Sequence, residues 1–317
     1  MPKLKGKKVA VLGGSGFFGS HMVSFLTERA IKVNVPRRSV YDFRKRSDCL
    51  KYFNRIKPNV VINCAAFQGG IGFHKGKQAD LFMDNMLMGC NLMEAAQTSG
   101  VRKFVNVVAG CAYPGYLDKQ VMSEDDLWSG DVHDSIFSYG FSRKATIVYG
   151  KALNKQYGFK SIHLLLANMY GPGDHFDPNK SKALAALIRK IYEAKNNSAD
   201  EVEIWGTGKP LRDWLYVKDG AAGVVRAAEV YDEIEPLNIA TGKGVTVTEL
   251  AENIRSAVGY DGKFVYNTDK PDGALKKIFS AKKMKKQLGW SPKTSIKKGI
   301  KETVKWFDAN YKSAISR

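Results

Sequence analysis

A glycine-rich run near the start of the sequence has the residue types and spacing that bind phosphate groups. It reads Gly13-Gly14-Ser15-Gly16-Phe17-Phe18-Gly19, between an apolar run at 8–12 and a helical stretch at 18–30. Glycines at this spacing allow a sharp turn, a close approach of the backbone to a pyrophosphate, and tight packing of helix on strand. The helix N-terminus adds free N–H groups and the positive end of a dipole. The run therefore predicts a dinucleotide site made of Gly13, Ser15, Gly16, Phe17, Phe18 and Gly19.

Two arginines follow the next strand-like run, at 31–35, where the adenosine ribose of a dinucleotide would lie. An NAD enzyme commonly has Asp or Glu here, to bind both ribose hydroxyls. This chain has Arg37 and Arg38 instead, and two guanidinium groups suit a 2′-phosphate. We therefore expect NADP(H) as the cofactor in preference to NAD(H). A solvated basic loop is the alternative interpretation.

The elements that must position these residues alternate along the first half of the chain. Strand-like runs span 8–12, 31–35, 59–65, 103–108 and 161–168, and helical stretches span 18–30, 46–57, 78–99 and 140–157. Such alternation predicts an α/β fold with a Rossmann-type, doubly wound parallel sheet.

After about residue 170 the pattern becomes mixed. We expect helices at 181–195, 218–230, 247–258, 280–288 and 296–310, a Gly/Pro-bearing stretch at 205–211 and a strand at 237–239. These later pieces suggest a smaller C-terminal α/β lobe that binds substrate. We expect an NADP-binding domain over residues 1–170 and a nucleotide-sugar-binding lobe over 171–317, with some chain crossing between the two.

Composition restricts the classes of protein that fit. The 317 residues are 44% hydrophobic, and the four cysteines have neither C-x-x-C spacing nor histidine partners at metal-ligand spacing. Free thiols in a reducing cytoplasm are therefore expected, with no disulfide frame and no metal site. The sequence shows no signal-like leader and no apolar run of membrane-spanning length, so no membrane partner is expected.

The formal net charge of +19 raises the question of nucleic-acid binding. Lysine pairs concentrate after residue 270, at 276–277, 282–283, 285–286 and 297–298, interleaved with apolar residues. That spacing favours solvated faces of amphipathic helices. A basic surface also attracts anionic substrates such as nucleotide sugars. No recognition-helix or RNA-binding signature is present, so we expect no nucleic-acid partner.

Further motifs run in order through the whole chain. They are Ala65-Ala66-Phe67-Gln68-Gly69-Gly70-Ile71, Gly110-Cys111-Ala112-Tyr113-Pro114, Asn168-Met169-Tyr170-Gly171-Pro172, 205–213 from Trp205 to Asp213, and Lys270-Pro271-Asp272-Gly273. With them the chain resembles the extended short-chain dehydrogenase/reductases, and within these the GDP-L-fucose synthase branch. The resemblance implies an NADP-dependent epimerase/reductase of a GDP-linked 4-keto sugar. It also implies a homodimer built from the long helices 78–99 and 140–157, and a cofactor contact at Ala65 and Ala66.

The resemblance also implies a catalytic Ser/Thr, Tyr and Lys, the last two in Tyr-x-x-x-Lys. Tyr139 matches the tyrosine, but Arg143 occupies the lysine position and Lys144 comes one residue late. One residue turns a helical side chain by about 100°, so Lys144 is a poor substitute. Arg143 can bind the nicotinamide ribose and favour tyrosinate by its charge, but it releases no proton near neutral pH. Ala109 stands where the family has Ser or Thr, which removes one donor to the sugar carbonyl.

Two further positions in this resemblance concern epimerisation. Cys111 matches a cysteine that acts as acid or base beside the sugar carbonyl, and its alternative role is that of a small buried apolar residue. Lys182 stands where the family has a histidine, as a proton donor, a phosphate contact or a surface lysine. The expected substrate contacts, with ordinary core or surface roles as their alternative, are Asn168, Lys182, Lys190, Trp205, Arg212 and Asp272.

Two other functions stay open at this point. The absent histidine favours a GDP-sugar 4-reductase or 4-dehydrogenase without epimerisation. Ala109 and Arg143 favour a catalytically weakened protein that binds a nucleotide sugar or a dinucleotide. Turnover of NADPH with a GDP-4-keto sugar separates the enzymes from the binding protein.

Overall fold

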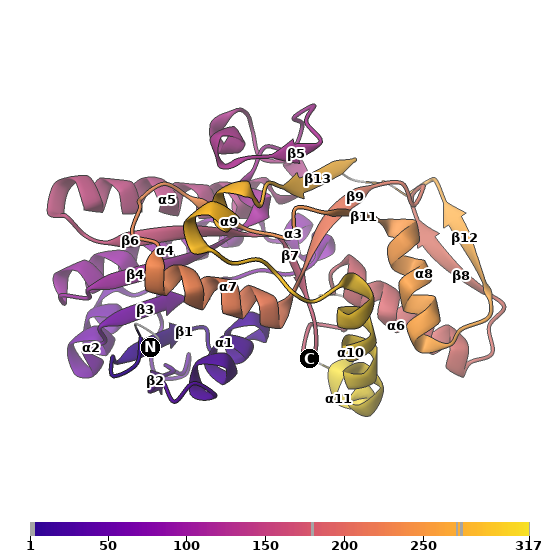
Figure 1. The fold of residues 1–317 in the computed structure, drawn as a ribbon, viewed down its shortest axis with the longest axis horizontal. Helices are drawn as coiled ribbons and strands as arrows, with labels where there is room; N and C mark the ends of the chain where they lie inside the picture. Colours follow the sequence, from indigo (N-terminus) through magenta and orange to yellow (C-terminus); the bar gives the residue numbers. More distant parts are fainter. Residues whose placement is uncertain (1–3, 179–180, 271, 273–274, 317) are drawn as a thin grey trace.

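Six parallel strands form the central sheet of the protein. The structure is a computed structural model, and it describes residues 4–178, 181–270, 272 and 275–316. The strand order is β10-β6-β4-β3-β1-β2, and every pairing is parallel (Figure 1). The bounds are β1 Val9–Leu12, β2 Val33–Asn34, β3 Val60–Asn63, β4 Lys103–Ala109, β6 Ser161–Leu166 and β10 Leu237–Ile239. The predicted α/β class with a Rossmann-type sheet is confirmed.

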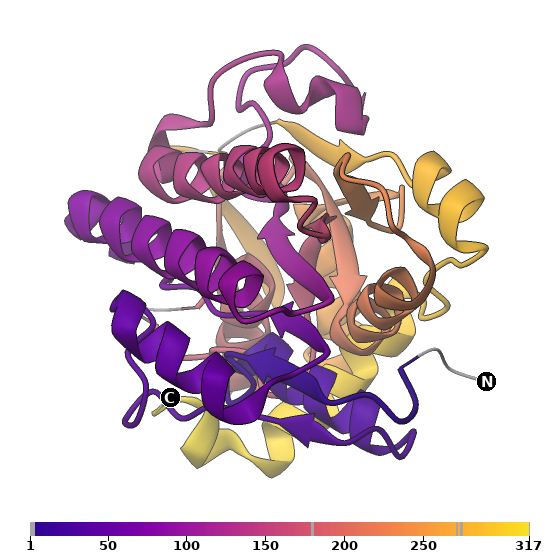
Figure 2. The same cartoon turned by 90° about the vertical axis from the view of Figure 1, so that its left-hand side faces the viewer.

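Helices cover both faces of this sheet (Figure 2). Helices α1 and α7 pack together on one face, whereas α2, α4 and α5 pack in sequence on the other. All residues of strand β1 are apolar because both of its faces are buried: Val9 and Val11 enter one core, while Ala10 and Leu12 enter the other. Successive strand side chains point to opposite faces, and both faces are buried. The bounds are α1 Phe17–Thr27, α2 Arg46–Ile56, α4 Gln78–Thr98, α5 Phe137–Tyr157 and α7 Val217–Val230.

A second core lies beyond the carboxyl ends of these strands (Figure 1). Helices α6, α8 and α10 pack around it, and strands β8 and β12 pair in parallel at its edge. Strand β9 runs between the two cores, because Leu215 enters the first while Trp214 and Tyr216 enter the second. The bounds are α6 Ala183–Asn196, β8 Glu201–Trp205, β9 Leu211–Tyr216, α8 Val247–Val258, β12 Lys263–Asn267, α10 Ile296–Ala309 and α11 Tyr311–Ala314.

Short elements connect the two parts. A mixed sheet has the order β11-β9-β13-β5, and β7 pairs with β9. The bounds are α3 Ile71–Gly76, β5 Val121–Met122, β7 Asn168–Tyr170, β11 Gly244–Thr246, β13 Lys276–Phe279 and α9 Lys282–Leu288, with 3-10 turns η1 Gly110–Ala112, η2 Glu124–Trp128 and η3 Asp134–Ile136. None of the described helices has the length and apolar character needed to cross a membrane.

Two expectations for the second half of the chain were wrong. Strand β10 belongs to the central sheet, because it pairs with β6. Helix α7 covers a face of that sheet, because it packs on α1, so neither element belongs to the C-terminal lobe. Residues 276–279 form strand β13 and not a solvated helix face, because Ile278 and Phe279 are buried and pair with β5. The chain therefore crosses between the two cores more than once.

Candidate active site

The glycine run forms a tight turn between β1 and α1. Gly13 has φ +70°, and a Cβ there would lie 2.8 Å from the backbone nitrogen of Ala65. A Cβ on Gly19 would lie 2.0 Å from the carbonyl oxygen of Gly13, so only glycine lets the helix pack this closely. Gly16 precedes α1 with extended backbone, and the first turn of α1 has no side-chain cap and no acidic residue. The helix N-terminus is therefore left to an anion from outside the turn.

The other predicted cofactor residues surround this turn. Ser15 is exposed, Phe17 half-buried and Phe18 buried. Ala65 and Ala66, which follow β3, are half-buried, and the Ala65 N–H donates to the side-chain oxygen of Asn63 (3.1 Å). The parallel pairing of β1 with β3 explains why Ala65 meets Gly13.

Arg37 and Arg38 follow β2, at the same edge of the sheet as the glycine turn. Strand β2 pairs in parallel with β1, so the carboxyl ends of the two strands lie side by side. Both arginines are exposed, and in the described part of the chain neither forms an ion pair. The two guanidinium groups are therefore available to a phosphate.

Tyr139 and Arg143 lie one turn apart on α5, beside the end of β4. Arg143 is 2% exposed, its Nη2 donates to the carbonyl oxygen of Val107, and its Nε is buried without a hydrogen-bond partner among the described residues. Tyr139 is also buried, and burial raises the pKa of its phenol while the charge of Arg143 lowers it. Lys144 points elsewhere: its Nζ donates to the Gly130 carbonyl (3.3 Å) and lies 5.0 Å from the Trp128 ring centroid. This orientation agrees with the expectation that Lys144 is a poor substitute for a lysine at position 143.

Cys111 lies in η1, directly after β4, against the start of α5. A Cβ on Gly140 would be 2.7 Å from the Cys111 carbonyl oxygen, so only a glycine next to Tyr139 permits this approach. Burial raises the pKa of the Cys111 thiol, and the charges of Lys277, Arg143 and Lys182 oppose that rise. Ala109, the last residue of β4, brings no hydroxyl group to this cluster.

Lys182 is exposed and stands just before α6. Its positive charge acts on three groups: it lowers the pKa of Cys111, of His74 and of Asp174. Burial nevertheless raises the pKa of Asp174 to about 6. Lys182 therefore contributes charge to the cluster that contains Cys111.

Sequence reasoning missed two residues of this cluster. Lys277 on β13 lies beside Arg212 on β9 in the parallel register, and its charge acts on Cys111. Its sequence gives no sign of this role, because Lys277 belongs to a lysine-rich stretch whose spacing favours solvated helix faces. His74 on α3 is 4% exposed, and its ring meets that of Tyr139 with centroids 5.5 Å apart. Its position three residues after Gly-Gly-Ile offered no local signal of a neighbour at 139.

The remaining predicted substrate residues group around the ends of β8 and β9. Trp205 is 59% exposed, and Nζ of Lys190 lies 5.1 Å from its ring centroid. The Asp272 carboxylate accepts from the Thr207 backbone N–H and hydroxyl, both at 2.7 Å, and its charge reaches Arg212. Exposed Asn168 donates to the Asp213 carbonyl (3.2 Å). Asp272 acts by charge on Arg212, Arg212 lies beside Lys277, and the charge of Lys277 acts on Cys111, so this group adjoins the cluster that contains Cys111.

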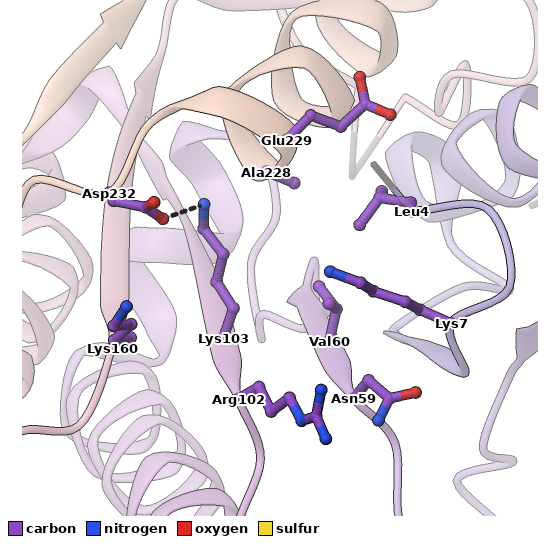
Figure 3. A pocket seen from close by; sticks show the side chains of 10 residues that line it. All are labelled: Leu4, Lys7, Asn59, Val60, Arg102, Lys103, Lys160, Ala228, Glu229 and Asp232. Atoms are coloured by element: carbon purple, nitrogen blue, oxygen red, sulfur yellow. Dashed lines mark hydrogen bonds and ion pairs between the residues drawn. The ribbon is translucent and has the colours of Figure 1, made fainter. Parts of the chain in front are cut away.

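A hollow of about 190 Å³ lies at the amino ends of the central strands, on the side of the sheet away from the glycine turn (Figure 3). Asn59, Val60, Arg102 and Lys103 line it at the amino ends of β3 and β4, and Lys103 pairs with Asp232 at 2.8 Å. Ligands of open parallel sheets bind beyond the carboxyl ends of the strands, where the glycine turn, Tyr139 and Cys111 lie. The described residues contain no group of three or more His, Cys, Asp or Glu that could hold a metal ion.

Comparison with known proteins gives consistent matches. Residues 9–240 match the NAD dependent epimerase/dehydratase family. The chain is 36% identical over 312 residues to probable GDP-L-fucose synthase 1 of Oryza sativa subsp. japonica, covering 98% of this chain and 94% of that protein. A solved GDP-6-OMe-4-keto-L-xylo-heptose reductase from C. jejuni is similar with a TM-score of 0.90 and 27% identity, covering 96% of this chain and 98% of that one. A GDP-L-fucose synthetase from Naegleria fowleri bound to NADP is similar with a TM-score of 0.89 and 27% identity, covering 98% and 95%.

Proposed function

Because the chain belongs to the NAD dependent epimerase/dehydratase family, we propose that it is an NADP-dependent epimerase/reductase of a GDP-linked 4-keto sugar. One observation carries this proposal: Tyr139, Arg143 and Cys111 lie near one another where β4 ends, on the same side of the sheet as the glycine turn that follows β1. The relatives named as GDP-L-fucose synthases and the GDP-heptose reductase support the class of substrate.

The cofactor has a consistent set of contacts. The pyrophosphate would lie on the glycine turn and the N-terminus of α1, and the 2′-phosphate between Arg37 and Arg38. The unpartnered Nε of Arg143 would donate to the nicotinamide ribose, and Ala65 and Ala66 would line the cofactor opposite Gly13. When bound, NADPH supplies a hydride for the C4 carbonyl of the sugar.

Tyr139 would exchange the proton on the sugar C4 oxygen. Its hydroxyl makes no hydrogen bond to the rest of the described chain, so it is available to a substrate. Arg143 holds a positive charge beside it and thereby stabilises the tyrosinate that is left after proton donation. Cys111 would act on a carbon next to the ketone, where carbon–hydrogen bonds are acidified by the carbonyl.

The GDP moiety would extend from this point toward the second core. Arg212 and Lys277, adjacent on β9 and β13, would take the diphosphate as two cations. Trp205 would pack on the nucleotide, with Lys190 and Asp272 beside it and Asn168 nearer the sugar. Residues 171–317 thus supply most of the nucleotide-sugar site, and residues 1–170 supply most of the cofactor site.

One observation favours a second candidate, a 4-reductase that does not epimerise. Lys182 stands at the family's histidine position and is exposed, and its charge opposes the effect of burial on the pKa of Cys111. A lysine of this kind stabilises an anion more readily than it shuttles a proton. The sugar products of the two candidates differ in configuration at C3 and C5, so product analysis separates them.

Oligomeric state and compartment also belong to this proposal. Helices α4 and α5 pack together and expose Met83, Phe141 and Val148, an apolar face that a second copy of the chain would cover. We therefore propose a homodimer. Free cysteines suit a reducing compartment, so we propose that the enzyme works in the cytoplasm.

The decisive experiment incubates the protein with NADPH and GDP-4-keto-6-deoxymannose, with GDP-4-keto-heptoses in parallel. We expect NADPH oxidation and a reduced GDP-sugar, which NMR identifies. Tyr139→Phe should abolish turnover while leaving NADPH binding within a few-fold of the parent. NADPH and sugar binding without turnover in the parent would instead establish a binding protein. Equal turnover by Tyr139→Phe and the parent would remove Tyr139 from the mechanism.

A further inference from the structure

His74 is a buried titratable group that the mechanism above does not use. It lies on α3, its side chain is 4% exposed, and its Nδ1 has no hydrogen-bond partner among the described residues. The Gly69 backbone interacts with the ring and raises the pKa of His74 against the larger effect of burial, while Nδ1 stays without a partner among the described residues. A buried polar atom without a partner is costly, and such atoms are rare in folded proteins.

Another histidine of the same chain shows what a structural role looks like. His163 is a fully buried residue of β6 that faces α5, with Nδ1 3.2 Å from the Asn106 amide and Nε2 3.4 Å from the Ser161 hydroxyl. Both of its ring nitrogens therefore have partners inside the protein. His74 differs because one nitrogen is left for a group that the chain itself does not provide.

The surroundings of His74 are those of the active site. Its ring meets the ring of Tyr139 edge to face, with centroids 5.5 Å apart and planes at 73°. The charge of Lys182 acts on His74 and on Cys111 alike. His74 from α3 and Cys111 from η1 therefore both border Tyr139, from different elements of the chain.

The protonation of the two groups is complementary. Burial lowers the pKa of His74, and the nearby positive charge of Lys182 lowers it further, so the imidazole is neutral near neutral pH. Burial raises the pKa of Cys111, so its thiol keeps its proton. A neutral imidazole is ready to accept a proton, and a thiol is ready to give one.

We propose that His74 is a catalytic base of this enzyme and that Cys111 is its partner acid in epimerisation beside the sugar ketone. The inference rests on the proposed function. It supplies the reaction with a histidine from another part of the chain, since Lys182 occupies the position where the family has its histidine. His74, through Nδ1, removes the proton from a carbon next to C4. The electrons of that carbon–hydrogen bond form a carbon–carbon double bond, and the carbonyl pair moves onto the C4 oxygen.

The return step reverses this electron flow. Cys111 donates its thiol proton to the opposite face of the same carbon, the C4 carbonyl re-forms, and the configuration is inverted. Imidazolium and thiolate remain, and no oxidant or reductant is consumed. A second epimerisation with the two roles exchanged restores both groups, as does proton exchange with water. Lys182 and Arg143 stabilise the anionic intermediate by charge.

Two measurements test this assignment. The first is deuterium incorporation at C3 and C5 of GDP-4-keto-6-deoxymannose in D₂O without NADPH, which reports proton transfer at carbon. The second is NADPH formation from GDP-L-fucose and NADP⁺, which reports hydride transfer from a sugar that is already epimerised. His74→Asn should lower the first rate roughly a hundredfold or more, as removal of a general base does, and leave the second within a few-fold.

A matched control is His175→Asn, which makes the same change at an exposed histidine and should alter neither rate. His74→Gln and circular dichroism of every variant separate loss of the base from loss of the fold. Unchanged deuterium incorporation in folded His74→Asn overturns the inference, and so does an equal loss of both rates or a loss in His175→Asn alone. A parent protein that shows neither activity with any GDP-4-keto sugar overturns the proposed function as well.

Discussion

Arg143 is hydrogen-bonded through Nη2 to the carbonyl oxygen of Val107, two residues before Ala109 on β4. This contact fixes the guanidinium against strand β4, which ends at Ala109, the position without a hydroxyl group, and is followed directly by η1 with Cys111. The positive charge stays beside Tyr139 and lowers the pKa of its phenol against the opposing effect of burial. Since a guanidinium releases no proton near neutral pH, in the proposed mechanism Arg143 would stabilise charge and Tyr139 would need another route to solvent for its proton.

The arginines after β2 give the first prediction. If Arg37 and Arg38 bind a 2′-phosphate, NADPH should bind at least tenfold more tightly than NADH, which corresponds to about 1.4 kcal/mol. The double variant Arg37→Ala, Arg38→Ala should lose most of that difference in calorimetry. Arg102→Ala, an exposed arginine at the opposite edge of the sheet, is the control and should keep it. Equal binding of NADH and NADPH by the parent would refute the NADP assignment.

Asp174 gives a prediction about stability and pH. Burial raises the pKa of Asp174 to about 6 from an ordinary 3.8, so the folded state binds its proton more tightly than the unfolded state does. This group therefore destabilises the fold increasingly as the pH rises from about 4 to about 6, with a full cost of about 3 kcal/mol above that range.

Asp174→Asn removes this ionisation. Its free energy of unfolding relative to the parent should shift in the variant's favour by about 2 kcal/mol between pH 4.5 and pH 7.5, measured by urea denaturation. Exposed Asp269→Asn should show no such shift. A difference between Asp174→Asn and the parent that is independent of pH would mean that Asp174 ionises normally in the folded protein.

The proposed homodimer predicts a specific effect at Val148, which is 52% exposed on α5. Val148→Glu places a charge in the apolar face of α4 and α5 and should convert the dimer to monomer in sedimentation experiments, because an unpaired charge is costly to bury. Val265→Glu, at a similarly exposed valine on β12, should leave the dimer intact. A parent protein that sediments as a monomer would exclude the dimer.

The residues that sequence reasoning placed well are those whose signal is local. Buried strands such as β3 and β6 are short runs of apolar residues, and the sequence predicted both as strands. Strand β8 has a local signal in the sequence, because Glu201-Val202-Glu203-Ile204 alternates charged and apolar residues, and the structure exposes and buries them with the same period of two. Strand β13 has no such signal in its sequence, since the pair Lys276-Lys277 is typical of a solvated helix face. Only the structure shows that Ile278 and Phe279 pair with β5.

The same distinction holds for the site. The glycine turn could be predicted because its geometry depends on neighbours in sequence, and Gly13 and Gly19 do meet each other. His74 and Lys277 could not, because each approaches Tyr139 or Cys111 only through the packing of separate elements. Such long-range proximity leaves no trace in local composition or spacing.

The altered catalytic group gives the last prediction. In the proposed mechanism, Ala109 would leave the sugar C4 oxygen without one hydrogen bond, and Arg143 would keep the charge of a lysine without relaying a proton. Both changes act on the transition state more than on the bound substrate, so we expect a low kcat with near-normal affinity. The double variant Ala109→Ser, Arg143→Lys should raise kcat tenfold or more, since one hydrogen bond of this kind contributes on the order of 3 kcal/mol. Its affinity for the GDP-sugar should change little.

The neighbouring Lys144→Arg provides the control for that double variant. It makes a charge-preserving exchange of the same kind, but Lys144 faces Trp128 and the Gly130 carbonyl, so kcat should stay as in the parent. Steady-state kinetics with the GDP-4-keto sugar that the parent reduces fastest measure both effects. A double variant slower than the parent would show that the site depends on Arg143. The hydrogen bond from Arg143 to Val107 would then hold the guanidinium for a step that lysine cannot perform.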